Sequence, residues 1–113
     1  MERMNKKFTR QIELDYEELG DGVRRKVLAY GEAMMQVLVE FEKGAVGKLH
    51  SHLHVQLTHV LEGSFKFTIG EEYQIVNKGD ILYKIPNIMH GCVCLEKGVL
   101  LDTFTPMRED FIK

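Results

Sequence analysis

The sequence has no long run of apolar residues and almost no excess of charge. No apolar stretch approaches the roughly 20 residues of a membrane-spanning helix. The N-terminal segment MERMNKKFTRQIELD lacks the apolar region of a secretion signal. The net charge is -2 and the basic residues are scattered, so the charge pattern gives no reason to expect nucleic acid or a membrane as a partner. We therefore expect a cytoplasmic protein that binds neither.

Cysteine is also scarce. The only two cysteines, Cys92 and Cys94, are one residue apart, which places both on one face of a strand and disfavours a disulfide between them. They could be thiolate ligands of a metal, but without a second cysteine pair this is a weak zinc signal. We favour reduced thiols that act as small core residues.

The chain is long enough for one domain with a single core. Short β-type runs separated by turn signals follow one another from VRRKVLAY to VLLDTF. In residues 64–69 the two phenylalanines and Ile69 alternate with polar residues. Strands at such near-regular spacing favour an all-β sandwich or barrel. The only helical candidate is one turn over residues 15–19, with Asp15 as its cap.

Four of the five histidines fall within ten residues, in and just after the segment HSHLHVQ. On a strand, His50, His52, His54 and Gln56 would all point to one side. A buried ring nitrogen without a partner costs on the order of 1–3 kcal/mol, and a divalent cation would satisfy several rings at once. The interior of a barrel is a place where such a site could form from several strands.

Two groups of residues resemble the two cupin motifs. The first group comprises His50, His52, Gln56 and Gly63, and the second comprises Gly79, Pro86 and His90. In the second motif Asn87-Ile88 stands where an inner glycine is usual. The resemblance implies an all-β, single-domain cupin, which is a double-stranded β-helix or jelly-roll barrel. The barrel would span residues 23–113, after an N-terminal arm of residues 1–22 that holds the short helical turn.

The same resemblance implies a metal site. Its ligands would be His50, His52, Gln56 and His90. The ion would be one divalent transition metal, and nickel, zinc, iron and manganese all accept imidazole. Gln56 stands where many cupins have glutamate, so the ion would keep more charge and act as a stronger Lewis acid. The alternative, in which Gln56 is only a core hydrogen-bonding residue, stays open. We expect His54 and His59 to be packing residues.

A narrower resemblance covers residues 25–112, on segments such as EFEKGAVGKLHSH, HGCVCLE and VLLDTFTPMREDF. These segments are similar to the KdgF family of small cupins, which convert 4,5-unsaturated monouronates from pectin or alginate into linear 5-keto-4-deoxyuronate. The match implies a ring-opening isomerase with Asp102, Phe104 and Arg108 in the metal pocket and a small sugar acid as substrate. Where similar proteins read histidine-proline-histidine-glutamate-glutamine, this chain has HLHVQ. We expect this departure to change the backbone bend next to the ligands and the rim of the pocket, and hence the substrate preference.

Each of these three residues has a second interpretation. Asp102 lies in an apolar strand, which favours an interior proton-transfer group over a surface residue. Arg108 offers a fork that binds a carboxylate at two points, or it pairs with Glu109 or Asp110. Phe104 forms the wall of the sugar site or packs in the core.

Two other functions and one assembly state follow from the sequence. The same set of metal ligands suits a cupin dioxygenase. A non-enzymatic sugar-binding sensor is the third alternative. Because an open barrel of this length leaves strand edges exposed, we also expect a homodimer, to which the N-terminal segment could supply an exchanged strand.

Overall fold

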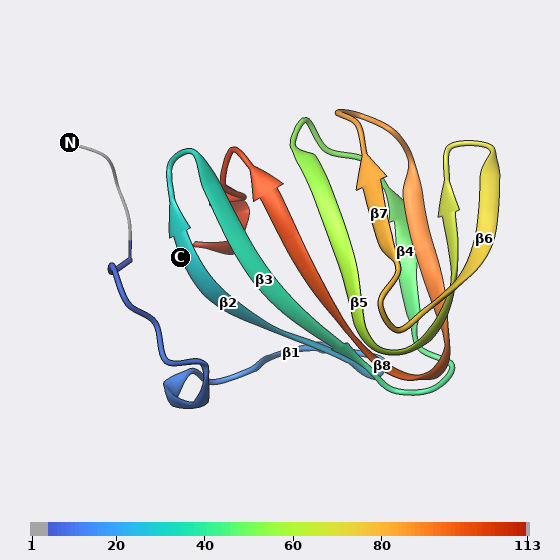
Figure 1. The fold of residues 1–113 in the computed structure, drawn as a ribbon, viewed down its shortest axis with the longest axis horizontal. Helices are drawn as coiled ribbons and strands as arrows, with labels where there is room; N and C mark the ends of the chain where they lie inside the picture. Colours follow the sequence, from blue (N-terminus) through green and yellow to red (C-terminus); the bar gives the residue numbers. More distant parts are fainter. Residues whose placement is uncertain (1–4, 113) are drawn as a thin grey trace.

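A computed structural model describes residues 5–112, which form an almost entirely antiparallel β structure (Figure 1). Its elements are η1 (Gln11–Glu13), β1 (Glu17–Gly20), β2 (Val23–Gly31), β3 (Met34–Phe41), β4 (Val46–His50), β5 (Val55–Ile69), β6 (Glu72–Asn77), β7 (Ile81–Lys84), β8 (His90–Thr105) and η2 (Glu109–Phe111). η1 and η2 are single 3-10 turns. In the part of the chain described here, no helix is long and apolar enough to cross a membrane. The expected all-β architecture is confirmed.

Two long strands, β5 and β8, pair with each other along their length and belong to both halves of one bent sheet. The first half of β5 and the second half of β8 lie with β3, β2, β1 and β7. The other halves of the same two strands lie with β4 and β6. The two halves meet at the bend of β5 and β8, and they diverge at the opposite end (Figure 1). Interior side chains from both halves therefore line a common cavity.

Glycine allows the two long strands to approach closely at the bend. Gly63 has a φ of 84°, in the left-handed region that favours glycine. A Cβ on Gly63 would lie 2.5 Å from the carbonyl oxygen of Lys97, and a Cβ on Gly98 would lie 2.6 Å from the ring of Phe65. The register between β5 and β8 shifts at the same place. The glycine of the first motif is thus required for the bend that closes the barrel.

The interior near the bend is apolar. The buried cluster there includes Phe41, Val60, Phe65, Cys94 and Leu100. Phe41 and Phe65 meet edge to face, with ring centroids 5.3 Å apart. Phe65 and Phe67 are buried while Lys66 between them is exposed, which confirms the alternation predicted for residues 64–69.

One predicted element in the N-terminal arm is wrong. The helical turn expected over residues 15–19 is absent, because Glu17–Gly20 form β1 and the helical turn η1 comes earlier, at Gln11–Glu13. β1 pairs with β2, with Glu17 opposite Arg25. A capping residue such as Asp15 contributes only about 1 kcal/mol, and the pairing of β1 with the sheet edge outweighs it.

Candidate metal centre and active site

Three histidines converge at the open end of the barrel. His50 ends β4 and His90 begins β8, and the two residues lie opposite each other in the strand pairing. His52 follows in the loop after β4. One nitrogen from each of the three rings lies within 4.8 Å of the others, and the ring centroids of His50 and His90 are 4.4 Å apart. A single cation could therefore bind all three imidazoles.

A backbone carbonyl orients each of these rings. The Nδ1 atoms of His50, His52 and His90 lie 2.8, 3.1 and 3.0 Å from carbonyl oxygens two residues away in the chain. A carbonyl oxygen only accepts, so each of these contacts favours the neutral tautomer that carries its proton on Nδ1 and leaves a lone pair on Nε2. Histidines that bind metals are commonly held by this kind of outer contact. All three rings are thus set up to offer Nε2 as a ligand.

Two features of the cluster are unfavourable without a cation. Nε2 of His90 is buried and has no hydrogen-bond partner among the described residues. Nε2 of His52 lies 2.9 Å from Oε1 of Gln56 and Nδ1 lies 3.1 Å from the carbonyl oxygen of His54, so a neutral ring with its single proton leaves one of these two contacts between two acceptors. Each unsatisfied buried group costs on the order of 1–3 kcal/mol. A divalent cation would coordinate these atoms and remove both penalties, so the residues present fit a bound metal.

A buried hydroxyl sets the orientation of Gln56. The Nε2 atom of Gln56 donates to Oγ1 of Thr58 at 3.1 Å, and this hydroxyl donates its own proton to Oδ1 of Asp102 at 2.6 Å. Because its proton is used on Asp102, Thr58 can only accept from Gln56. The amide must therefore direct its oxygen toward His52. A purely hydrogen-bonding role explains the amide nitrogen, but the oxygen then has a donor only if the proton of His52 is on Nε2, which leaves Nδ1 of that ring facing the carbonyl oxygen of His54.

Burial keeps the histidines in the form that binds metal. It lowers the pKa of His90 to about 3, and the nearby charge of Lys84 adds to the effect. The pKa of His52 is also lowered, again mainly by burial. Metals bind neutral imidazole. At neutral pH these two rings therefore need to release no proton before they coordinate an ion.

Lys84 on β7 is a buried polar residue that the sequence analysis missed. Its side chain is almost fully buried, and its Nζ donates to Oγ1 of Thr58 at 2.8 Å. Burial lowers the pKa of Lys84, while the charge of Asp102 opposes that shift. Thr58 thus links a lysine, a carboxylate and the amide of Gln56. A signal was available in the run ILYK, because strand alternation places Lys84 on the same face as the apolar Leu82.

Asp102 and Phe104 lie on the interior face of β8 and are both buried. The alternative of a surface aspartate is therefore excluded. They line a cavity of about 250 Å³ together with His50, Gln56, His90 and Arg108. The ring of Phe104 stands edge-on to that of His52, with centroids 5.6 Å apart. The cavity has room for a molecule the size of one sugar ring.

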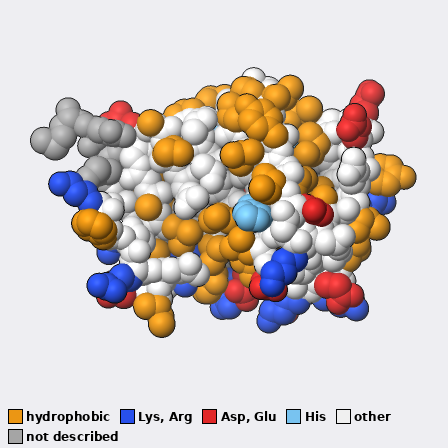
Figure 2. All heavy atoms as spheres, viewed as in Figure 1, with side chains coloured by type: hydrophobic (Ala, Val, Ile, Leu, Met, Phe, Trp, Pro, Cys, Tyr) orange, Lys and Arg blue, Asp and Glu red, His pale blue; other side chains and the backbone are white. Residues whose placement is uncertain are grey.

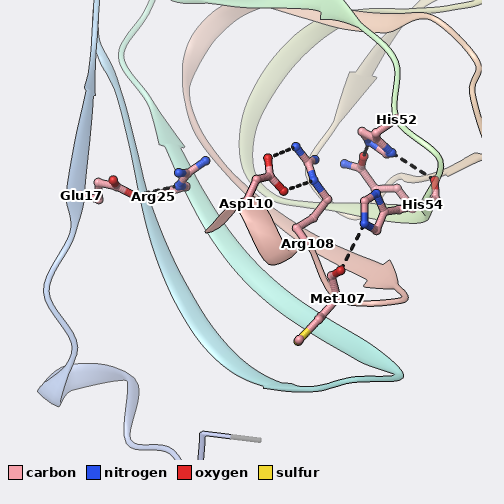
Figure 3. A network of polar contacts seen from close by, with 8 residues as sticks. Glu17, Arg25, His52, His54, Met107, Arg108 and Asp110 are labelled. Carbon is pink, nitrogen blue, oxygen red and sulfur yellow. Dashed lines mark hydrogen bonds and ion pairs between the residues drawn. The ribbon is translucent and has the colours of Figure 1, made fainter. Parts of the chain in front are cut away.

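Arg108 pairs with an acidic neighbour, which is one of its two predicted interpretations. Its Nε and Nη2 atoms donate to the carboxylate of Asp110 at 3.0 and 2.8 Å (Figure 3). This contact is the main cause that lowers the pKa of Asp110. Arg108 is mostly buried and lines the cavity, whereas Asp110 is exposed. The guanidinium therefore already binds a carboxylate at two points, and a ligand could take the place of Asp110.

The other two clustered histidines are not members of the metal-capable group, although the ring of His54 packs against that of His52 with centroids 5.4 Å apart. Within residues 5–112 that group contains His50, His52 and His90 alone. Nε2 of His54 donates to the carbonyl oxygen of Met107 at 3.1 Å, so this ring is tied to the C-terminal segment (Figure 3). His59 lies opposite Ile81 and Leu101 in the strand pairing. Both positions suit the packing role that the sequence predicts.

The two cysteines are buried and unpaired, as predicted. Cys92 lines the cavity, but burial raises the pKa of its thiol to about 12. The pKa of Cys94 is raised for the same reason. Since the thiolate is the form that binds metals, this pair is disfavoured as a ligand set.

Comparisons with known proteins agree with this arrangement. Residues 37–104 match the model of the cupin domain family. The pectin degradation protein KdgF of Dickeya dadantii (strain 3937) is 46% identical over 102 residues, which is 88% of this chain and 93% of that protein. The crystal structure of an RmlC-like cupin from Shewanella frigidimarina superposes with a TM-score of 0.93 at 35% identity, covering 96% of this chain and 98% of the other. The structure of KdgF from Halomonas sp. superposes with a TM-score of 0.91 at 33% identity, covering 96% of this chain and 100% of the other.

Proposed function

The chain belongs to the cupin family and, within it, to the family of KdgF, and from this premise we propose that it is a metal-dependent enzyme that opens the ring of 4,5-unsaturated monouronates. The product would be the linear 5-keto-4-deoxyuronate. The observation that carries the proposal is the buried carboxylate of Asp102, which lines the same cavity as His50 and His90. The relative from Dickeya dadantii, which is named a pectin degradation protein, supports the substrate class.

His50, His52, His90 and the amide oxygen of Gln56 would hold the metal ion. When bound, a divalent transition metal such as nickel, zinc, iron or manganese supplies Lewis-acid stabilisation of negative charge on a substrate oxygen. These four ligands are all neutral, so the ion would keep more of its charge than it would beside a glutamate. An anionic sugar acid is a suitable substrate for such a site.

Asp102 is the group that moves the proton in this proposal. It takes the proton of the anomeric hydroxyl. The electron pair of that O–H bond forms the carbonyl bond of the aldehyde, and the bond from the anomeric carbon to the ring oxygen breaks. The ring oxygen leaves as an enolate. Asp102 then returns the proton to the former double-bond carbon, which gives the ketone, so the reaction is an isomerisation without net gain or loss of a proton. A positioned proton-transfer group contributes about 100-fold to 10,000-fold to the rate.

The contacts of Asp102 suit this role. Thr58 donates to Oδ1, and no hydrogen bond among the described residues uses Oδ2. One oxygen therefore fixes the carboxylate while the other is available to the substrate.

Arg108 and Phe104 would position the substrate. Arg108 would bind its carboxylate in place of Asp110, with the same two-point geometry that the pair already shows. Phe104 would form an apolar wall beside the sugar ring. Neither residue needs to exchange a proton for this function.

The proposal is tested by following the ultraviolet absorbance of an unsaturated monouronate, prepared with a polyuronate lyase, with and without the metal-loaded protein. We expect the absorbance to disappear at a rate proportional to protein concentration, with the ketone visible in the NMR spectrum of the product. Oxygen consumption during the reaction would instead support the dioxygenase. Binding of the uronate without any loss of absorbance would support the sensor, and either result contradicts the proposal.

We also propose that the protein is a homodimer. Exposed apolar side chains lie next to one another on the outer surface of β5 and β7, namely Leu57, Ile81 and Tyr83. Figure 2 shows hydrophobic side chains gathered over these strands. A second copy would cover this surface and shield strand edges. Light scattering at micromolar concentration should give twice the mass of the 13.1 kDa chain, and the mass of a single chain would contradict the proposal.

A further inference from the structure

Two arginines from distant parts of the chain lie on one aromatic ring beside the cavity. Arg25 comes from β2 and Arg108 from the C-terminal segment, and both line the cavity (Figure 3). Their guanidinium carbons lie 3.8 and 4.3 Å from the centroid of the Phe111 ring. The two guanidinium carbons are therefore no farther apart than these two distances combined, so two cationic groups lie close together beside the same cavity.

Each of these arginines is bound by a carboxylate that is more exposed than the arginine itself. Arg25 donates from Nε to Glu17 at 3.0 Å, and the side chains are 15% and 40% exposed. For Arg108 and Asp110 the corresponding values are 12% and 60%. Ion pairs with such exposed carboxylates contribute only about 0–1 kcal/mol. An incoming carboxylate could therefore replace or join these internal partners at little cost.

The adjacent Arg24 shows that an ion pair does not require the buried position of Arg25. Arg24 is paired with Glu40 at 2.7 Å and stacks on Tyr16 at 3.9 Å, so its contacts are of the same kind. Its side chain is nevertheless 41% exposed and does not line the cavity. Placing a guanidinium group against the cavity, away from bulk water, costs desolvation energy. In addition, none of the hydrogen bonds among the described residues uses the two terminal NH2 groups of Arg25. These groups are available to a ligand in the cavity.

We propose that Arg25 is a second carboxylate-binding residue, which together with Arg108 holds the carboxylate of a sugar acid beside Phe111 and so selects anionic over neutral sugars. The identity of the sugar acid rests on the proposed function. The placement of two guanidinium groups on the Phe111 ring beside the cavity does not depend on the proposed function. Arg25 takes no part in proton transfer and acts on substrate binding.

The kinetic test compares Arg25→Gln with Arg24→Gln, which removes the same charge and the same type of ion pair from the neighbouring residue. With the unsaturated monouronate we expect Arg25→Gln to raise KM about 10-fold to 100-fold, the range for losing a hydrogen bond to a charged group, with kcat nearly unchanged. Arg24→Gln should leave both constants unchanged. Equal KM values for the two variants would overturn the proposal. Arg25→Lys, which keeps the charge but not the fork, should give an intermediate KM.

A binding measurement separates a failure of this inference from a failure of the proposed function. D-Galacturonate has the carboxylate but no double bond, and D-galactose lacks the carboxylate. By calorimetry, the wild-type protein and Arg24→Gln should bind galacturonate more tightly than galactose, and this preference should be clearly weaker in Arg25→Gln, where only Arg108 remains. If the wild type fails to turn over the unsaturated uronate but shows this pattern, the function is wrong and Arg25 is still an anion-binding residue. Absence of galacturonate binding, or binding that is equal in all variants, would overturn the inference.

Discussion

The two ends of the barrel interior are built from the same strands but from opposite kinds of side chain. Near the bend, β5 and β8 contribute Phe65 and Cys94 to an apolar cluster. Toward the open end, the same strands contribute Thr58 and Asp102 to a buried hydrogen-bonded network. We call these regions the apolar end and the polar end. The apolar end stabilises the fold through burial, whereas the polar end buries groups that are satisfied only in one arrangement.

This difference predicts that substitutions at the two ends have separable effects. A change at the apolar end should lower stability and leave the chemistry of the remaining folded protein intact. A change at the polar end should alter metal binding or catalysis more than it alters stability.

The largest effect is expected from removing a histidine at the polar end. His52→Ala and His90→Ala should each abolish metal binding, because both delete a ligand from the three-histidine group. Elemental analysis of the purified variants measures this directly. His54→Ala is the matched control, since this ring binds the carbonyl of Met107 instead, and it should keep the metal. Full occupancy in either of the first two variants would refute the assignment of the ligands.

At the apolar end, Phe65→Ala should lower the free energy of unfolding by about 3–5 kcal/mol, the usual result of truncating a fully buried phenylalanine. Urea unfolding provides the measurement. Tyr73→Ala removes an exposed ring from the neighbouring strand and should change stability by about 0.5 kcal/mol. The folded fraction of Phe65→Ala should still bind one metal ion per chain, and loss of the metal from folded protein would show that the two ends are not separable.

Thr58→Val should have a smaller effect on stability and a distinct effect on the metal. The substitution keeps the shape but removes the hydroxyl shared by Gln56, Lys84 and Asp102. We expect a loss of about 1–3 kcal/mol of stability and a metal affinity about 10-fold to 100-fold weaker. The control is Thr103→Val, on the same strand as Asp102. The hydroxyl of Thr103 accepts only one solvent-exposed hydrogen bond, from Gln36. If both variants keep the wild-type affinity, the network does not orient Gln56.

The smallest effect concerns acid stability of the metal-free protein. The pKa of His90 is about 3 in the folded chain and about 6.5 in an unfolded one. Between these values the unfolded chain binds a proton that the folded chain does not, so the free energy of unfolding falls as the pH falls. In urea titrations between pH 6.5 and 5, His90→Gln should show a shallower decline than the wild type. Identical declines would mean that His90 is not desolvated as the structure indicates.

The strands and the pair His50 and His52 were predictable because they depend on local spacing, whereas His90 was named through the resemblance to the second cupin motif. Histidines one residue apart, a glycine at the bend and the alternation of residues 64–69 are visible in the printed sequence. The network around Thr58 was not predicted, since it requires β5, β7 and β8 to be neighbours, and their pairing is non-local. Lys84 was given no role from the sequence, because its burial depends on where its strand lies in the sheet. The wrong helical turn at residues 15–19 has the same cause, because the partner of Glu17 is a residue on another strand.

Arg25 shows a further limit of the sequence. It is adjacent to Arg24 and chemically identical, and only the position of the C-terminal segment with Phe111 shows which of the two faces the cavity. Of the three residues that the resemblance named at the C-terminal end, Asp102 is buried in the interior, as a proton-transfer group there would be. Phe104 fits both of its interpretations, because it lines the cavity and also packs in a buried cluster with Met35 and Val37. Arg108 satisfies both of its interpretations, because it lines the cavity and pairs with Asp110.

The central claim is that the polar end performs proton transfer through Asp102, and the most direct test is the kcat of Asp102→Asn with an unsaturated monouronate. The amide keeps an oxygen that can accept the hydrogen bond from Thr58, so the metal content should remain close to that of the wild type, while loss of the negative charge near the buried Lys84 should lower the thermal stability. Our account predicts that kcat falls by about 100-fold or more. A metal-loaded Asp102→Asn protein with the wild-type kcat would contradict it.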